Sequence, residues 1–225
     1  MRVTAARPPH SSLIMAGPRA SAERWTRFVR ADQIHRNARL VEAIRETADA
    51  RTLVFECMDG QPVVASAGQF MTLQLDIDGQ RYKRAYSLSQ APAGNRFAVT
   101  VKHVPGGRVS ALLNEQLMAG DSVQFNGPSG DFTLPAVSAP HYVFAAAGSG
   151  ITPVMCMMEA LVAAAGKASP GITLVYGNRH ANDIIFADRL QALAARHPAL
   201  KIVHVLSKPA RGWKGARGRI SADHL

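Results

Sequence analysis

The hydrophobic pattern of the chain changes once, around Pro135 and Pro140, and this change restricts the fold more than any other feature. Before it, short alternating or apolar runs are separated by turn signals such as Asp78-Gly79, which predicts a hairpin. Such runs predict antiparallel strands. They cover residues 38–44, 52–57, 69–77, 84–89, 97–103 and 122–126, with one short helix expected at 109–117. Short strands at this spacing favour a small antiparallel β-barrel.

After the two prolines, apolar strands alternate with helical segments. Strands are expected at 142–146, 172–176 and 201–206, and helices at 153–165 and 185–197. Strand–helix–strand repeats predict a parallel sheet with crossover helices. The chain is therefore expected to hold a β-barrel at 38–137 and an α/β domain at 138–225, preceded by a disordered or leader segment at 1–37.

The composition is that of a folded protein, since 47% of the 225 residues are hydrophobic and 19% are charged. The formal net charge of +10 raises the question of a nucleic-acid partner. The positive charge lies at the two ends: residues 1–40 carry +6 and residues 208–219 carry +5, while the rest sums to −1. A near-neutral body, with few aromatic side chains among the basic residues, argues against nucleic-acid binding.

Cys57 and Cys156 are the two cysteines, and they lie far apart with no C-x-x-C pairing. This excludes a disulfide scaffold and a four-cysteine zinc or iron–sulfur site within the chain, and it favours a reducing, cytoplasmic setting. Cys156 is expected inside a helix as a core residue. Residues 132–158 lack Asp, Glu, Lys and Arg, but prolines and glycines interrupt them, so no membrane span is expected.

Four short segments carry residues suited to a phosphate-containing cofactor. The first is Arg84-Ala85-Tyr86-Ser87, where strand alternation places Arg84 and Tyr86 on one face. A guanidinium can hold a phosphate through two hydrogen bonds, and a phenol ring offers a flat surface for stacking. Taken alone, the segment is a weak signal and fits a surface arginine beside a half-buried tyrosine better.

The second segment, Pro105-Gly106-Gly107-Arg108-Val109-Ser110, leads into the expected short helix. Glycines before a helix expose backbone N–H groups to an anion. Ser110 is suited either to cap this helix or to contact the same phosphate. A simple capped turn is the alternative explanation.

The third segment, Gly148-Ser149-Gly150-Ile151-Thr152-Pro153, lies directly between a predicted strand and a predicted helix. Its glycines let a nucleotide pyrophosphate approach the backbone, and Pro153 suits a first helical turn. Pro153 stands where the Rossmann fingerprint has its third glycine, so the match to that motif is partial. The strand–loop–helix context favours nucleotide binding.

The fourth segment, Tyr176-Gly177-Asn178-Arg179, ends the second strand of the parallel sheet, at the carboxyl edge where such sheets bind ligands. Arg179 is suited to a ribose 2′-phosphate, and Ser207-Lys208 ends the next strand. A solvated loop arginine is the alternative.

In this order, the four segments resemble the ferredoxin–NADP reductase superfamily, and within it the reductase components of bacterial oxygenases, such as the phenylacetyl-CoA epoxidase reductase. The resemblance covers about residues 38–225 and is carried mainly by Arg-x-Tyr-Ser at 84–87 and Gly-Ser-Gly-Ile-Thr-Pro at 148–153. It implies an antiparallel Greek-key FAD-binding barrel followed by a Rossmann-like NAD(P)-binding α/β domain. It also implies an FAD-dependent NAD(P)H oxidoreductase that uses NADPH or NADH, with Arg179 favouring NADPH.

The resemblance assigns the residues nearest the reacting rings. Tyr86 stacks on the flavin, Ser87 lies near flavin N5, and Thr152 lies nearest the nicotinamide. These three residues are the expected catalytic set.

The resemblance also assigns the residues that hold the cofactors. Those on the FAD side are Arg84, Val101, Lys102, His103, Gly107, Arg108, Val109 and Ser110, with Arg84 on the pyrophosphate. Those on the nicotinamide side are Gly148, Gly150, Ile151 and Pro153, and those toward the adenosine end are Asn178, Arg179 and Ser207.

The expected partner is a ferredoxin-like or oxygenase electron acceptor, served by a monomeric chain. Relatives continue beyond 218–220 with a strand that ends in Cys-Gly-Pro, and many carry a four-cysteine [2Fe–2S] domain. Neither is found in this sequence, so no iron–sulfur cluster is expected in this chain. We expect a C-terminally truncated reductase, and a flavin-binding remnant without NAD(P)H turnover is the alternative.

Overall fold

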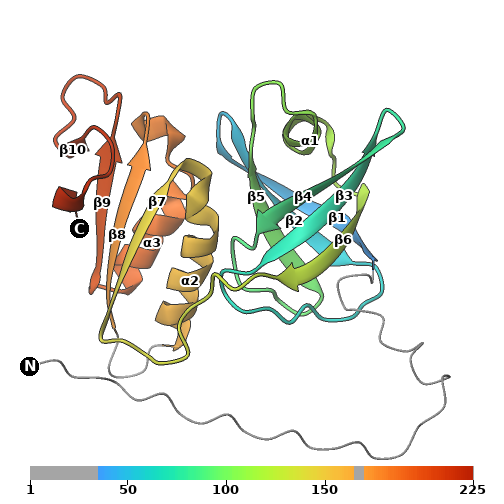
Figure 1. The fold of residues 1–225 in the computed structure, drawn as a ribbon, viewed down its shortest axis with the longest axis horizontal. Helices are drawn as coiled ribbons and strands as arrows, with labels where there is room; N and C mark the ends of the chain where they lie inside the picture. The colour runs from blue at the N-terminus through green and yellow to red at the C-terminus, as the bar shows by residue number, and fades with distance from the viewer. Residues whose placement is uncertain (1–34, 165–169, 225) are drawn as a thin grey trace, which may run out of the picture.

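Two β-sheets of different kinds lie side by side within residues 35–164 and 170–224, the parts of the chain that the computed structural model describes (Figure 1). Of the leader expected at 1–37, residues 1–34 lie outside the described residues. The first strand begins at Arg36, inside the expected leader. The predicted architecture, a barrel followed by an α/β domain, is confirmed.

The first sheet is antiparallel and curls into a barrel. Its six strands in the described residues are β1 (Arg36–Thr47), β2 (Ala50–Cys57), β3 (Phe70–Ile77), β4 (Gln80–Ser87), β5 (Arg96–Lys102) and β6 (Ser122–Ser129). They are hydrogen-bonded in the order β4-β3-β6-β1-β2-β5. A bridge between Leu88 and Val99 joins the chain just after β4 to β5, and it closes the barrel at this point.

Asp78 and Gly79 form the predicted hairpin turn between β3 and β4. Ile77 and Gln80 face each other across the turn, and Asp78 and Gly79 have positive φ angles of 52° and 73°. A two-residue turn of this kind matches the twist of the flanking strands and favours Asp-Gly. The turn fixes the register of β4, and therefore the face on which Arg84 lies.

Three phenylalanines pack against one another in the core of the barrel. The ring centroids of Phe55 and Phe97 are 5.4 Å apart, and those of Phe97 and Phe125 are 4.8 Å apart. All three side chains are buried, and each contributes about 1.5–3 kcal/mol through this burial. The barrel is therefore a packed support for the strand ends at its rim.

The short helix between β5 and β6 differs from its prediction. The sequence predicts one unbroken helix at 109–117, whereas α1 (Arg108–Ala111) continues as a π-helical turn at Leu112–Gln116. The N–H of Leu117 donates to the carbonyl five residues earlier, at 2.9 Å. Arg51 donates to the carbonyl of Leu117 at 2.9 Å, so a side chain from β2 ends the helix.

The second sheet is parallel. In the described residues its four strands are β7 (His141–Ala147), β8 (Gly171–Asn178), β9 (Leu200–Leu206) and β10 (Ala216–Arg217), in the order β10-β9-β8-β7. The crossover helices are α2 (Ile151–Ala164) and α3 (Ala187–Arg196). The sequence does not predict β10, because a two-residue strand has no periodic pattern. Across the described residues, no helix is long and apolar enough to cross a membrane.

Helix α2 lies between the parallel sheet and the barrel (Figure 1). Val154 and Met155 belong to the core of the α/β domain, whereas Cys156 packs into the core of the barrel. Cys156 is therefore the core residue that the sequence predicts, and burial raises the pKa of its thiol. A Cβ placed on Gly68 of the barrel would lie 2.9 Å from the terminal methyl of Met157 on α2.

Replacing Gly68 by alanine is expected to destabilise this junction. The added Cβ would lie 2.0 Å from the carbonyl oxygen of Phe132, and Gly68 has a φ of +103°. Gly60→Ala is the control, because Gly60 also has a positive φ, +68°, but nothing lies within 4 Å of an added Cβ. Backbone strain costs each variant about 1–2 kcal/mol, and overpacking adds about 1–3 kcal/mol for Gly68→Ala. Thermal unfolding should show the larger loss for Gly68→Ala, and equal losses would contradict the close contact.

Candidate functional site

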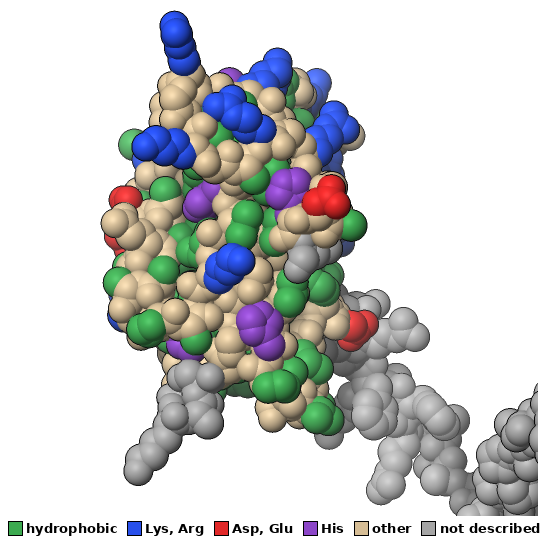
Figure 2. Space-filling model, turned by 90° about the vertical axis from the view of Figure 1, so that its left-hand side faces the viewer, with side chains coloured by type: hydrophobic (Ala, Val, Ile, Leu, Met, Phe, Trp, Pro, Cys, Tyr) green, Lys and Arg blue, Asp and Glu red, His purple; other side chains and the backbone are tan. Residues whose placement is uncertain are grey.

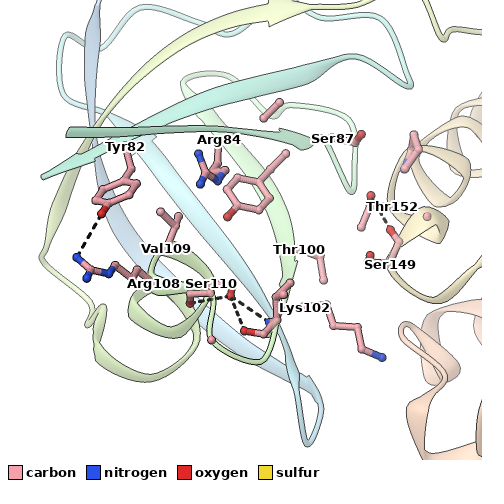
Figure 3. A pocket seen from close by; sticks show the side chains of 17 residues that line it. Tyr82, Arg84, Ser87, Thr100, Lys102, Arg108, Val109, Ser110, Ser149 and Thr152 are labelled. Carbon is pink, nitrogen blue, oxygen red and sulfur yellow. Dashed lines mark hydrogen bonds between the residues drawn. The ribbon is translucent and has the colours of Figure 1, made fainter. Parts of the chain in front are cut away.

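A cavity of about 790 Å³ opens where the barrel meets the start of α2 (Figure 3). Its walls come from β4, the end of β5, the loop before α1 and the first turn of α2. They are formed by Tyr82, Arg84, Ala85, Tyr86, Ser87, Thr100, Lys102, Val104, Gly106, Gly107, Arg108, Val109, Ser110, Ser149, Gly150, Thr152 and Pro153. Cofactor sites measure about 300–1,000 Å³, so the cavity can hold a large organic ligand.

Strand β4 places Arg84 and Tyr86 in this cavity, as strand alternation predicts. Nη1 of Arg84 donates to the carbonyl of Lys83 at 2.8 Å, and the guanidinium lies 5.9 Å from the centre of the Tyr82 ring. Within the described residues, Arg84 has no carboxylate partner. Burial raises the pKa of Tyr86 to about 12, although the charge of Arg84 acts in the opposite direction. The phenol is therefore a neutral ring at pH 7.

The loop before α1 forms a tight backbone cradle on another wall (Figure 3). Oγ of Ser110 accepts a hydrogen bond from the N–H of Val104 at 3.0 Å and donates to the carbonyl of Gly107 at 3.1 Å. A Cβ added to Gly107 would lie 2.7 Å from Oγ of Ser110. Ser110 shapes the loop instead of capping α1, whose start has no side-chain hydrogen bond from its capping residue.

The start of α2 forms the wall on the side of the α/β domain. Gly148–Gly150 form a 3₁₀ turn, and Oγ1 of Thr152 donates to the carbonyl of Ser149 at 3.1 Å. A Cβ on Gly150 would meet nothing within 4 Å. No contact inside the protein requires a glycine here. The missing side chain therefore leaves space for a ligand in the cavity. Ser87, at the end of β4, and Thr152 line the same cavity (Figure 3).

Another cavity, of about 350 Å³, lies at the carboxyl ends of β7, β8 and β9. It is lined by Lys102, Ala147, Gly148, Gly177, Asn178, Arg179, Ser207, Gly218, Arg219 and Ile220, so that Lys102 lines both cavities. Lys and Arg side chains gather at this end of the sheet (Figure 2), where the basic run 208–219 folds back beside β9. The N–H of Ser207 donates to the carbonyl of Asn178 at 2.9 Å, which holds two of the strand ends together.

Tyr176 fixes the loop that separates the two cavities. Its ring is buried in β8, and its hydroxyl donates to the carbonyl of Gly148 at 2.9 Å. Burial raises the pKa of Tyr176 well above its ordinary value, so the hydroxyl keeps the proton that it donates. The glycine loop is therefore held from below by a side chain of the neighbouring strand.

Three predicted cofactor residues, Val101, His103 and Ile151, do not line the larger cavity. Val101 packs into the barrel core and Ile151 into the core of the α/β domain. Nε2 of His103 lies 3.5 Å from a carboxylate oxygen of Glu115, and His103 does not line the cavity. The cavity wall at this strand end is formed by Lys102, because neighbouring residues of a strand point to opposite faces.

Several residues that line the cavities are missing from the sequence prediction, among them Tyr82, Ser149 and Arg219. Tyr82 lies on the same face of β4 as Arg84 and Tyr86, so strand alternation could have predicted that it lines the cavity. Arg219 lies in the basic run, and only the folding back of this run brings it to the cavity. Ser149 lies inside the glycine loop that the sequence singles out.

Comparison with protein families matches both halves of the chain. Residues 37–134 match the oxidoreductase FAD-binding domain, and residues 144–225 match the oxidoreductase NAD-binding domain. Ferredoxin–NADP reductase B of Sorangium cellulosum is 36% identical over 186 residues, which cover 82% of this chain and 75% of that protein. The chain belongs to the ferredoxin–NADP reductase superfamily. The resemblance seen in the sequence is confirmed.

Other similar proteins belong to different enzyme systems. The glycine betaine monooxygenase reductase subunit of Chromohalobacter salexigens is 35% identical over 196 residues, which cover 84% of this chain and 52% of that protein. The solved FAD/NAD-binding domain of nitric oxide dioxygenase from Vibrio cholerae has a TM-score of 0.76 at 25% identity, over 84% of this chain and 81% of that chain. The chain spans about half the length of several of its curated relatives.

The larger cavity fits the FAD that membership of the superfamily implies. Arg84 is a cation without a carboxylate partner among the described residues, as a phosphate site requires. Gly150 leaves open space at the wall formed by α2, where a Cβ would meet nothing within 4 Å, and Tyr86 offers a neutral ring. FAD and NAD(P)H are therefore supported by the cavities and by both family matches.

Arg84→Ala is expected to lose FAD. A hydrogen bond to a charged group contributes about 1.5–3 kcal/mol, so the affinity for FAD should fall about 10- to 150-fold. Arg81→Ala is the control, because Arg81 lies on the same strand but pairs with Asp76 at 3.1 Å outside the cavity. Flavin content after gel filtration and titration of the apoprotein with FAD measure the effect. Stoichiometric FAD in Arg84→Ala would contradict this assignment.

His204 is expected to make stability depend on pH. Its ring is partly buried, 6.1 Å from the Tyr176 ring, and burial lowers its pKa below the ordinary 6.5. As the pH falls below about 6.5, the unfolded chain takes up a proton that the folded chain does not, so stability falls. His204→Gln should flatten this fall between pH 7 and 5 in thermal unfolding, with the exposed His141→Gln as a substitution control. An equally steep fall in His204→Gln would rule out His204 as its source.

Proposed function

We propose that the chain transfers a hydride from NADPH to FAD and passes the electrons one at a time to an iron–sulfur acceptor of an oxygenase system. FAD supplies the chemistry that links a two-electron donor to a one-electron acceptor. The observation that carries this proposal is the cavity of about 790 Å³ shared by the barrel and α2. Within it, Tyr86 and Ser87 on the flavin side face the same space as Thr152 on the nicotinamide side.

The contribution of the protein is positioning, because the reactivity belongs to the cofactors. Arg84 and the cradle at Gly107 would hold phosphate groups, and the neutral ring of Tyr86 would support the flavin. Thr152 would contact the nicotinamide from a fixed place, since its hydroxyl is tied to the carbonyl of Ser149 at 3.1 Å. Ser87 ends β4 at the meeting point of the two domains, where it would be closest to the reacting atoms.

A preference for NADPH over NADH is supported by the charge around the smaller cavity. Arg179 and Arg219 line it, and the basic run 208–219 adds further positive charge at the same end of the sheet. An extra phosphate on the ribose is the feature that distinguishes NADPH from NADH, and arginine binds phosphate with paired hydrogen bonds. We therefore assign the adenosine end of NADPH to this cavity.

The proposed acceptor is supported by the relatives. One similar protein is the reductase subunit of a monooxygenase, and another is a ferredoxin–NADP reductase. The similarity to the FAD/NAD-binding domain of nitric oxide dioxygenase makes a haem acceptor the alternative to be distinguished. The two cysteines of the given sequence are both buried, so the proposed iron–sulfur acceptor lies outside these residues.

Anaerobic addition of NADPH to the FAD-loaded protein tests this proposal. The flavin absorbance band should bleach at a rate that saturates with NADPH, and a plant-type [2Fe–2S] ferredoxin should then restore it. Restoration by a haem protein alone would replace the proposed acceptor. A band that stays oxidised would contradict the proposal and support a flavin-binding remnant without turnover.

Arg179→Ala is expected to weaken NADPH selectively. Loss of a charged hydrogen bond of about 1.5–3 kcal/mol should raise the KM for NADPH about tenfold or more, while the KM for NADH changes less than about twofold. Arg211→Ala is the control, because it removes the same charge from the basic run but does not line the cavity. Steady-state kinetics with both nucleotides measure the ratio. Equal effects on NADPH and NADH would remove Arg179 from the phosphate site.

A further inference from the structure

One arginine joins the two sides of the larger cavity from outside it. Arg189 lies on α3 in the α/β domain, and its Nη2 donates to both carboxylate oxygens of Glu159 on α2, each at 2.9 Å. The same nitrogen donates to the backbone carbonyl of Ser89 in the barrel at 3.0 Å. The guanidinium also lies 4.6 Å from the centre of the Phe186 ring. One side chain therefore bonds to both domains.

Both hydrogen-bond partners of Arg189 lie close in the chain to residues that line the larger cavity. Ser89 follows the end of β4 at Ser87 by two residues, and its N–H donates to the carbonyl of Ala98 at 3.0 Å, which anchors it in the barrel. Glu159 follows Thr152 by seven residues, about two helical turns along α2. Arg189 therefore ties the strand end that carries Ser87 to the helix that carries Thr152.

The surroundings of Arg189 differ from the apolar packing that joins α2 to the barrel at Cys156. A cavity of about 280 Å³ lies beside it, between the barrel and the start of α3, and polar side chains such as Arg45, Gln90 and Asp188 line it. The contact of α2 with Gly68, through Met157, is a separate point of attachment. Together with this contact and the packing of Cys156 in the barrel core, Arg189 restrains the orientation of the α/β domain on the barrel.

The environment of the Arg189–Glu159 pair suits a fixed geometry. The side chains are only 28% and 25% exposed, so solvent screens the pair less than an exposed ion pair. The planar guanidinium, once placed on a carboxylate and over a ring, has few other orientations available. A lysine would keep the charge but would lose the planar arrangement.

We propose that Arg189 is a positioning residue that sets the distance between the nicotinamide-binding loop and the flavin side of the cavity. It touches no wall of the larger cavity, so it acts through Ser89 and Glu159. The inference rests on the proposed function, because the distance matters for hydride transfer. A small displacement of one domain relative to the other moves the reacting atoms out of the near-attack range.

The first arm of the test measures transfer. Arg189→Met keeps most of the apolar stem and removes the guanidinium, and Arg196→Met, at the exposed end of the same helix, is the matched control. In anaerobic stopped flow, Arg189→Met should retain FAD and reduce it at least tenfold more slowly at saturating NADPH, with a KM changed less than about threefold. Arg189→Lys should recover only part of the rate, and Arg196→Met should match the unmodified protein.

The second arm measures geometry without relying on activity. Cys57 and Cys156 are buried, so spin labels can be attached at cysteines introduced by Val64→Cys in the barrel and Val143→Cys in the α/β domain, positions that are 83% and 54% exposed. Electron–electron distance measurements should give a narrow distribution for this pair. Adding Arg189→Met should broaden or shift it, and adding Arg196→Met should leave it unchanged. If Arg189→Met does not fold, the isosteric Glu159→Gln is measured in its place.

The two arms separate the possible outcomes. A broadened distribution together with slower flavin reduction supports the positioning role. An unchanged distribution, or an unchanged rate, overturns it. If the unmodified protein is not reduced by NADPH, the proposed function fails. In that case the distance measurement alone still decides whether Arg189 holds the two domains in one arrangement.

Discussion

Helix α2 has to be compatible with two hydrophobic cores at once, and the rest of the molecule is arranged around this requirement. Its first turns place Val154 and Met155 in the α/β core and Cys156 in the barrel core. A helix buried on two sides cannot have a narrow apolar stripe, which explains why residues 151–158 are nearly all apolar. The same helix carries Thr152 at its start, so core packing determines where a residue that lines the larger cavity stands relative to the barrel.

The sequence was sufficient to predict the main elements because their signals are local. Alternation along β4, the Asp78-Gly79 turn and the glycine loop at 148–150 each depend on a few neighbouring residues, and all appear as expected. The order of the segments then identified the superfamily. The sequence could also separate the charged ends from a near-neutral body, and this separation removed nucleic acid from the expected partners.

What the sequence could not predict depends on contacts between distant segments. Which of the two faces of β5 is turned to the cavity depends on how the barrel closes, and this selects Lys102 over its two neighbours. At the end of the π-helical turn, the carbonyl of Leu117 accepts a hydrogen bond from Arg51 on another strand. Arg189 looks like an ordinary helical arginine in the sequence, because its partners lie 30 and 100 residues away.

The hydrogen bond from Tyr176 to the carbonyl of Gly148 has a consequence for the entropy of ligand binding. A glycine-rich loop normally loses much conformational freedom when a ligand orders it. Here a buried hydroxyl from β8 already restrains the loop at 2.9 Å, so most of that freedom is lost when the chain folds. A nucleotide therefore meets a loop that is already in place, and more of its contact energy appears as affinity.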